Sequence, residues 1–190
     1  MESFERCKER FAAPAPHPFH MTFETWLAED RTAVTIRPIS AADLTLEQEF
    51  VNGLSPSTGY QRLMSARKLS LEELIRLTNI DTEHELALIA TTPVLGRERE
   101  IGVARYVKEG TCGEAEFAIV LSDDWQGRGL GSKLLASLIA AAKRHGVRRL
   151  FGMTMSTNEG MLALGRKLGF KVASDPGSAT IKILTLDFAV

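Results

Sequence analysis

Cysteine and long apolar runs are scarce in this chain of 190 residues, and each shortage excludes a class of protein. The two cysteines, Cys7 and Cys112, stand far apart without CxxC spacing, which excludes a disulfide scaffold and a cysteine-based zinc site. No apolar run approaches the ~20 residues that span a bilayer. The first ten residues mix charges of both signs, unlike a secretory signal. We therefore expect a cytoplasmic protein that binds no membrane.

Neither sign of charge is in excess. The 23 Lys and Arg residues nearly balance the 24 Asp and Glu residues, and a net charge of -1 argues against a nucleic-acid partner. A chain that is 44% hydrophobic and 25% charged can bury a real core. His17 and His20 lie three residues apart with no third ligand nearby, so we expect no metal.

The first 33 residues differ from the rest of the chain. Pro14, Pro16 and Pro18 break any helix there, because proline lacks the backbone N–H. A regular alternation of apolar and polar residues, typical of a strand, begins at Val34. We interpret residues 1–33 as an N-terminal extension and residues 34–190 as the domain. The extension is expected to pack on the domain; a partner-binding or self-association arm is the alternative.

Hydrophobic periodicity and turn signals predict a mixed α/β (α+β) domain with one crossover, after Leu121. The expected elements, in chain order, are strand 34–39, helix 42–53, a short helix at 60–64, helix 70–77, strands 85–91, 100–108 and 114–121, helix 130–145, strand 148–155, a helix opening at Asn158, and strands 170–174 and 179–188.

Three glycines in five residues, Gly127-Arg-Gly129-Leu-Gly131, separate the strand at 114–121 from a long helix. The first N–H groups of a helix have no partner within it and lie at the positive end of its dipole. Glycine allows the backbone to approach a ligand closely, and Arg128 adds a positive charge. The segment therefore predicts an anion site, most naturally for phosphate or pyrophosphate.

Several known types of phosphate-binding loop can be compared with this segment. A Walker A loop fails because Ser132 stands where that motif requires glycine. Ser132 also breaks the dinucleotide fingerprint, and a single crossover is too little for a doubly wound sheet. The Q/R-x-x-G-x-G loop of acyl-CoA-dependent N-acyltransferases is matched by Gln126-Gly-Arg-Gly129-Leu-Gly131. Glycines that only tighten the turn remain the alternative.

Other segments extend this match over about residues 34–188. They are Ile36-Arg-Pro38-Ile39, Leu54-Ser-Pro-Ser, Leu77-Thr-Asn-Ile80-Asp81, Glu85-Leu-Ala-Leu-Ile-Ala90, Gly102-Val-Ala-Arg105-Tyr-Val107, Ala115-Glu-Phe-Ala-Ile-Val, and Asn158 with Leu168-Gly-Phe170. With the glycine loop they resemble the GNAT superfamily of acetyltransferases, and within it the bacterial protein lysine acetyltransferases of the Pat type. The resemblance implies a central, mostly antiparallel sheet flanked by helices and splayed open between Leu121 and a strand starting near Arg148.

The same resemblance implies acetyl-CoA as the cosubstrate, lying in that splay. Backbone groups of the strand end would pair with the pantetheine arm, the amides of the glycine loop would hold the pyrophosphate, and Asn158 would touch the arm. The full set of implied contacts is Ile119, Val120, Leu121, Gln126, Gly127, Arg128, Gly129, Leu130, Gly131, Ser132 and Asn158.

Glu116 is the candidate general base. A lysine amine attacks a thioester only when neutral, and with a pKa of about 10.4 only ~0.04% is neutral at pH 7, roughly 4.6 kcal/mol uphill. Glu116 shares a strand face with Ala118 and Val120, where burial would raise its pKa and improve it as a base. It also matches the base of Pat-type enzymes; a solvated or salt-bridged glutamate is the alternative. Gly165 occupies the position of a tyrosine acid in the superfamily, so no general acid is assigned.

These observations favour transfer of an acetyl group to a primary amine, with a protein lysine as the favoured acceptor. Such an enzyme should show an open groove beside Glu116. A small-molecule amine N-acetyltransferase, the first alternative, should show a closed acceptor pocket. A non-catalytic acyl-CoA sensor or partner module, the second, should be indifferent to Glu116→Gln. An acceptor protein and a second copy of this chain are the macromolecular partners left open.

Overall fold

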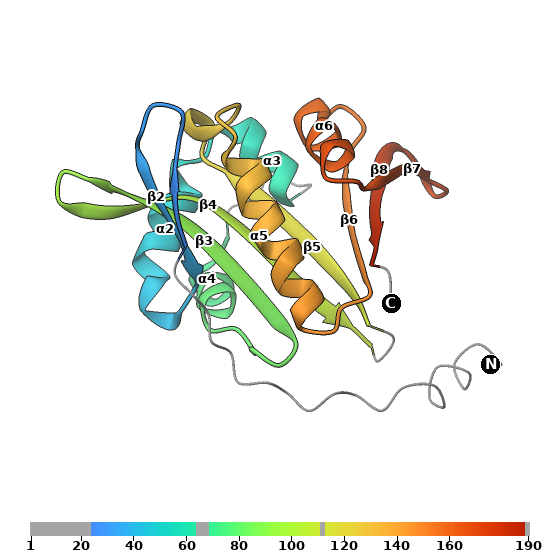
Figure 1. Cartoon of the computed structure of the whole chain (residues 1–190), viewed down its shortest axis with the longest axis horizontal. Coiled ribbons are helices and arrows are strands. Elements are labelled where there is room, and N and C mark those ends of the chain that lie inside the picture. Colours follow the sequence, from blue (N-terminus) through green and yellow to red (C-terminus); the bar gives the residue numbers. More distant parts are fainter. Residues whose placement is uncertain (1–23, 64–68, 111–112, 189–190) are drawn as a thin grey trace.

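The computed structural model describes residues 24–63, 69–110 and 113–188, and its strands form one eight-stranded sheet (Figure 1). The strand order is β1-β2-β3-β4-β5-β6-β8-β7. Every neighbouring pair is antiparallel except β5 with β6, as expected for one crossover. The strands are β1 (Glu24–Leu27), β2 (Ala33–Pro38), β3 (Glu85–Val94), β4 (Arg97–Glu109), β5 (Glu114–Leu121), β6 (Arg149–Met155), β7 (Lys171–Asp175) and β8 (Ser178–Asp187).

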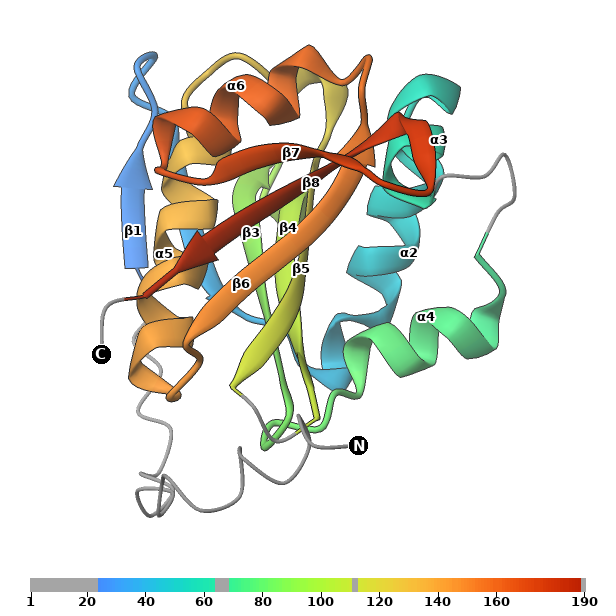
Figure 2. The same cartoon turned by 90° about the vertical axis from the view of Figure 1, so that its right-hand side faces the viewer.

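Helices cover both faces of this sheet. Figure 2 shows α5 on one side of β3, β4 and β5, and α2 and α4 on the other. The helical segments are η1 (Ala41–Asp43), α2 (Leu44–Gly53), α3 (Pro56–Leu63), α4 (Leu71–Thr78), η2 (Asp123–Trp125), α5 (Leu130–Arg144) and α6 (Glu159–Lys167). The expected mixed α/β fold with helices around a central sheet is therefore confirmed.

Two hydrophobic cores fill the space between the sheet and its helices. The larger lies under α5, where Leu134, Leu135 and Leu138 are fully buried, as their helical spacing predicts. The smaller packs Phe50 of α2 against β3 and β4. The two faces of β5 divide between these cores, since Phe117 belongs to the first and Val120 to the second. Burial thus confirms the predicted alternation along this strand.

The hairpin of β3 and β4 is longer than expected. Its strands continue past the predicted ends at 91 and 100, so that Val94 pairs with Arg97. Only Leu95 and Gly96 form the turn, and both have positive φ, at 50° and 78°. Two positive φ values match a two-residue type I′ hairpin, which Leu at the first position does not signal. The short helix expected at 60–64 is also displaced: α3 begins at Pro56, where proline is favoured in the first turn.

Strand β1 falls within residues 1–33, the segment interpreted as an N-terminal extension. It pairs with β2 from Glu24↔Ile36 to Leu27↔Ala33 and so adds an edge strand to the sheet. At least this part of the segment is therefore paired with the domain's sheet, and the boundary at residue 33 stays a prediction. Strand β1 has only four residues and follows a proline-rich stretch. Its alternation of apolar and polar residues is therefore too short to predict a strand from the sequence. Cys7, His17, His20 and Cys112 lie outside the described residues.

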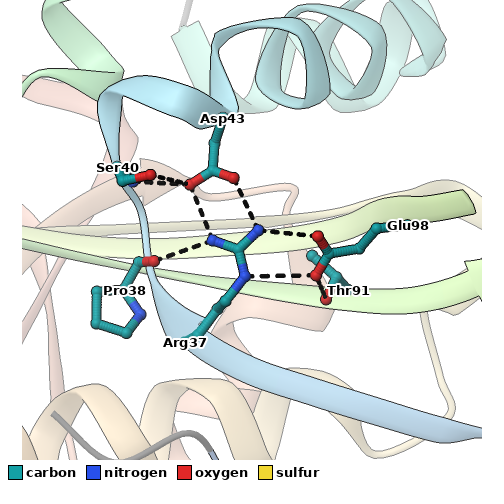
Figure 3. Close-up of polar contacts among 6 residues, drawn as sticks. All are labelled: Arg37, Pro38, Ser40, Asp43, Thr91 and Glu98. Atoms are coloured by element: carbon teal, nitrogen blue, oxygen red, sulfur yellow. Dashed lines mark hydrogen bonds and ion pairs between the residues drawn. The ribbon is translucent and has the colours of Figure 1, made fainter.

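A partly buried ion-pair network connects η1 to the sheet (Figure 3). Arg37 of β2 donates two hydrogen bonds to Asp43, at 2.7 and 2.8 Å, and two more to Glu98 of β4. Ser40 donates to Asp43 from its amide and its hydroxyl, and Thr91 donates to Glu98 at 2.6 Å. Burial raises the pKa of Asp43, but the hydrogen bonds from Arg37 and Ser40 outweigh burial and hold that pKa below its usual range.

Arg37→Met is therefore expected to lower the free energy of unfolding by about 3 kcal/mol, because it leaves Asp43 as a buried carboxylate without its cation. The side chains of Arg37 and Asp43 are only 13% and 7% exposed. The matched control is Arg99→Met, which breaks an ion pair to Asp124 whose side chains are 48% and 54% exposed. Arg99→Met should lower the free energy of unfolding by at most about 1 kcal/mol. Urea unfolding of both variants at pH 7 measures the difference, and equal losses would contradict it.

Candidate active site

A cleft opens where β5 and β6 part. The two strands pair only from Glu114↔Arg149 to Glu116↔Phe151, and no further pairing joins them over the rest of β5. The splay implied by the family resemblance is therefore present. A cleft of about 640 Å³ occupies it. Its lining residues are Thr58, Glu116, Phe117, Ala118, Ile119, Val120, Leu121, Gln126, Gly127, Gly129, Gly131, Ser132, Gly152, Met153, Thr154, Asn158, Gly160, Met161, Ala163, Leu164, Lys167 and Leu184.

The glycine loop forms one end of the cleft. Gly127 and Gly129 both have positive φ, at 74° and 85°, a region that favours glycine. Gly129 is the N-cap residue of α5 and, having no side chain, leaves the first amides of the helix uncapped. Gly131 lies in the first turn, between Leu121 and Leu164. This combination of free amides, helix dipole and close backbone access suits a diphosphate.

Arg128 and Leu130 are implied contacts whose side chains do not line the cleft. The Arg128 guanidinium lies over the Trp125 ring, 5.1 Å from its centroid, and 3.4 Å from Asp30. Leu130 is fully buried in the core under α5. In this structure the Arg128 guanidinium therefore faces Trp125 and Asp30, and its role as a positive group for the phosphates stays a prediction. The backbone amides of these two residues remain predicted contacts.

Glu116 lines the cleft at the point where β5 and β6 separate. Its side chain is half-buried, and burial raises its pKa, with a further increase from the negative charge of Glu109. A raised pKa makes the ionised carboxylate a stronger base. Across the sheet it lies beside Val107 of β4 and Phe151 of β6. The geometry therefore gives the cleft a carboxylate suited to accepting a proton.

Asn158 lines the opposite side of the cleft, at the start of α6. Its side-chain oxygen accepts a hydrogen bond from the Met161 amide at 3.1 Å and so caps the helix. The Nδ2 group of the same side chain remains a donor by its chemistry. Asn158 thus caps the helix that the sequence predicts to open at this residue.

Neither tyrosine of the sequence lines the cleft. The Tyr106 hydroxyl is within 2.5 Å of Nδ1 of His145, in the core under α5, and Tyr60 lies exposed on α3. At Gly165, the position that the resemblance compares with a tyrosine acid, a Cβ atom would collide with the buried Leu184 side chain. The position is therefore filled by Leu184, and a side chain there would have to displace it.

Several lining residues were not predicted, among them Thr58, Gly152 and Lys167. Gly152 allows β6 to run close to β5, since a Cβ atom there would lie 2.8 Å from the carbonyl oxygen of Phe117. Thr58 comes from α3, far from the glycine loop in sequence. A glycine within a strand signals close backbone approach, whereas nothing local marks Thr58 or Lys167.

Comparison with known proteins agrees with this geometry. The acetyltransferase (GNAT) domain family matches residues 33–171. Acetyltransferase PA5475 of Pseudomonas aeruginosa is 34% identical over 153 residues, covering 80% of this chain and 82% of that protein. Acetyltransferase Pat of Mycolicibacterium smegmatis is 33% identical over 138 residues, or 70% of this chain, which spans only 40% of that relative.

A solved structure supports the fold in the same way. The GNAT domain of S. lividans PAT superposes with a TM-score of 0.79 at 24% sequence identity, covering 87% of this chain and 97% of that domain. The chain belongs to the GNAT acetyltransferase family and has the GNAT fold. It is an acyl-CoA-dependent N-acetyltransferase.

Within the described ranges, no helix is long and apolar enough to cross a membrane, and no three His, Cys, Asp or Glu side chains gather as a metal site.

Proposed function

We propose that this enzyme transfers the acetyl group of acetyl-CoA to the side-chain amine of a protein lysine, with Glu116 as general base. The observation that carries the proposal is the exposure of the sheet around Glu116. Val107 is 39% exposed and Met153 is 50% exposed, and both lie on the same sheet face as Glu116. Ala118, the next residue on that face, is also exposed. This open strip, Val107, Glu116, Ala118 and Met153, suits a side chain presented by another protein better than a free amine.

Charge around the open strip supports a cationic acceptor. Glu109 of β4 lies two residues along the strand from Val107, the residue that pairs with Glu116 across β4 and β5. Carboxylates attract a lysine ammonium group to this end of the sheet. The raised pKa of Glu116 then favours transfer of the ammonium proton to it, directly or through one water molecule. The neutral amine then attacks the thioester carbonyl, the amide C–N bond forms and the C–S bond breaks. CoA leaves as the thiolate and takes up the second amine proton, so that free thiol is the product.

The residues along the cleft fit the cosubstrate. From Phe117 onward the edge of β5 that faces β6 has no strand partner among the described residues, so backbone groups of Ile119 to Leu121 can pair with the pantetheine amides. The uncapped amides at the start of α5 would hold the diphosphate, and Nδ2 of Asn158 would donate to the pantetheine arm. Acetyl-CoA supplies the activated acetyl group. The relatives named above are bacterial, which supports a bacterial source for this enzyme.

The acceptor class is tested with purified enzyme, acetyl-CoA and a panel of folded proteins, lysine peptides and small amines. Release of free thiol measures turnover, and mass spectrometry locates the acetyl group. We expect acetylation of lysine side chains on folded proteins. Turnover with small amines alone would replace the proposal by a small-molecule acetyltransferase, and CoA binding without turnover on any acceptor would replace it by a sensor.

A further inference from the structure

A polar cluster joins α3 to the loop that leads into the glycine segment. Asp123 of η2 accepts hydrogen bonds from the Ser55 amide at 3.0 Å, the Ser55 hydroxyl at 2.7 Å and the Thr58 hydroxyl at 2.7 Å. The Gln126 side-chain amide donates to the Thr58 hydroxyl at 3.2 Å. These four residues, Ser55, Thr58, Asp123 and Gln126, are here named the Asp123 cluster. It connects positions 65 to 68 residues apart in the sequence.

The Asp123 cluster reaches the cleft directly. Thr58 and Gln126 both line it. The Gln126 amide also approaches the carbonyl oxygen of Leu121, at 3.4 Å, where β5 ends. The cluster therefore links three walls of the cleft: α3, the end of β5 and the loop whose amides suit a diphosphate.

The Asp123 cluster holds the one buried side chain among residues 56–60 of α3. That side chain belongs to Thr58, which is polar. Burial raises the pKa of Asp123, but the hydrogen bonds from Ser55 and Thr58 outweigh burial and leave that pKa below its ordinary value. Asp123 is thus ionised at neutral pH, and hydrogen bonds to a charged acceptor are stronger than neutral ones.

We propose that Asp123 and Thr58 are positioning residues for acyl-CoA binding, which hold α3 and Gln126 against the glycine loop and so set the width of the cleft. This inference rests on the proposed function of the cleft as the acyl-CoA site. It concerns a carboxylate that neither reacts nor contacts the diphosphate. Asp123 affects the affinity for the cosubstrate indirectly, because it sets the positions of the residues that line the cleft.

Two pairs of variants test the proposal, each with a matched control. Asp123→Asn weakens the cluster, whereas Asp124→Asn changes the adjacent carboxylate, which pairs with Arg99 on the surface. Thr58→Val removes the central hydroxyl, whereas Thr92→Val removes a buried hydroxyl that donates to the Ala33 carbonyl in β2 and does not line the cleft. Thr58→Ser keeps the hydroxyl and should rescue binding.

Calorimetry with CoA and steady-state kinetics give the readouts. Asp123→Asn and Thr58→Val should each raise the Kd for CoA and the KM for acetyl-CoA about tenfold, the loss expected for part of a charged hydrogen bond. Kcat should change less than KM. Asp124→Asn, Thr92→Val and Thr58→Ser should stay within about twofold of wild type.

The outcomes separate this proposal from the one on which it rests. If wild-type protein binds no CoA, the proposed function fails. If wild-type protein binds CoA and Asp123→Asn binds it as well as Asp124→Asn does, only the positioning role fails. Equal losses of affinity in Thr58→Val and Thr92→Val would likewise overturn it, since they would reflect general destabilisation.

Discussion

Glu116→Gln is expected to lower kcat by about 10²- to 10⁴-fold, the usual contribution of a general base. The amide has nearly the same size as the carboxylate, so the cleft should keep its shape, but it cannot accept the proton of the attacking amine. The Kd for CoA should not change, because Glu116 lies at the opening of the splay and not at the glycine loop. Thiol release under saturating substrates measures the effect.

The matched control is Glu114→Gln, two residues earlier on the same face of β5. Glu114 pairs with Arg149 at 3.0 Å and does not line the cleft, so its removal should leave kcat near the wild-type value. A fully active Glu116→Gln enzyme would exclude Glu116 as the base. Equal losses in both variants would point to a general electrostatic effect of carboxylates at this end of the sheet.

The pH dependence of kcat/KM should report the same carboxylate. Burial, and after it the charge of Glu109, raises the pKa of Glu116. A base acts only when ionised, so kcat/KM should rise with pH through a pKa above the ordinary glutamate value of about 4.3. Glu109→Gln removes a negative neighbour, so the rise of kcat/KM with pH should move to lower pH. Glu116→Gln should abolish this rise. A rise that persists in Glu116→Gln would belong to the titration of another group.

Gly131→Val should weaken CoA binding by at least about 100-fold, or roughly 3 kcal/mol. A Cβ atom at this position would already lie 3.3 Å from Cδ1 of Leu121 and 3.4 Å from Cδ2 of Leu164. The two further methyl groups of valine would extend into the cleft beside the first amides of α5 and keep a phosphate from reaching them. Calorimetry with CoA measures the loss.

Gly131 gives a cleaner test than Gly129, whose φ of 85° would strain any valine regardless of the ligand. In a helix, valine is slightly more favourable than glycine, so lost helix stability would not explain weaker binding. The control is Gly53→Val at the end of α2, where no atom lies within 4 Å of an added Cβ. Unchanged CoA affinity in Gly131→Val would refute the placement of the diphosphate at the glycine loop.

Local pattern accounts for most of the secondary structure and for one end of the candidate site. The stripe of Leu134, Leu135 and Leu138 predicts α5 and the core beneath it, because helical periodicity selects the buried face without reference to the rest of the chain. Alternation along β5 predicts in the same way which of its side chains enter each core. The uncapped start of α5 at Gly129 also follows from its own sequence.

Contacts between distant segments could not be predicted in this way. Thr58 enters the cleft because Asp123 holds it there across 65 residues, and no local pattern encodes that distance. Arg128 looked like a ligand for phosphate, yet its side chain stacks on Trp125 near Asp30, a residue from the segment interpreted as an extension. Strand β1, which is four residues long, is specified by its pairing with β2 more than by its own composition.

The sequence by itself determined most of the helices and strands, the glycine loop and the carboxylate on β5, since each follows from spacing along a single segment. Only the tertiary structure decided where β5 and β6 separate, which residues line the resulting cleft and how far Glu116 is buried. The physical reason is that strand pairing and burial are set by contacts among several elements at once. The pKa of Glu116 depends on those contacts and not on its neighbours in the chain.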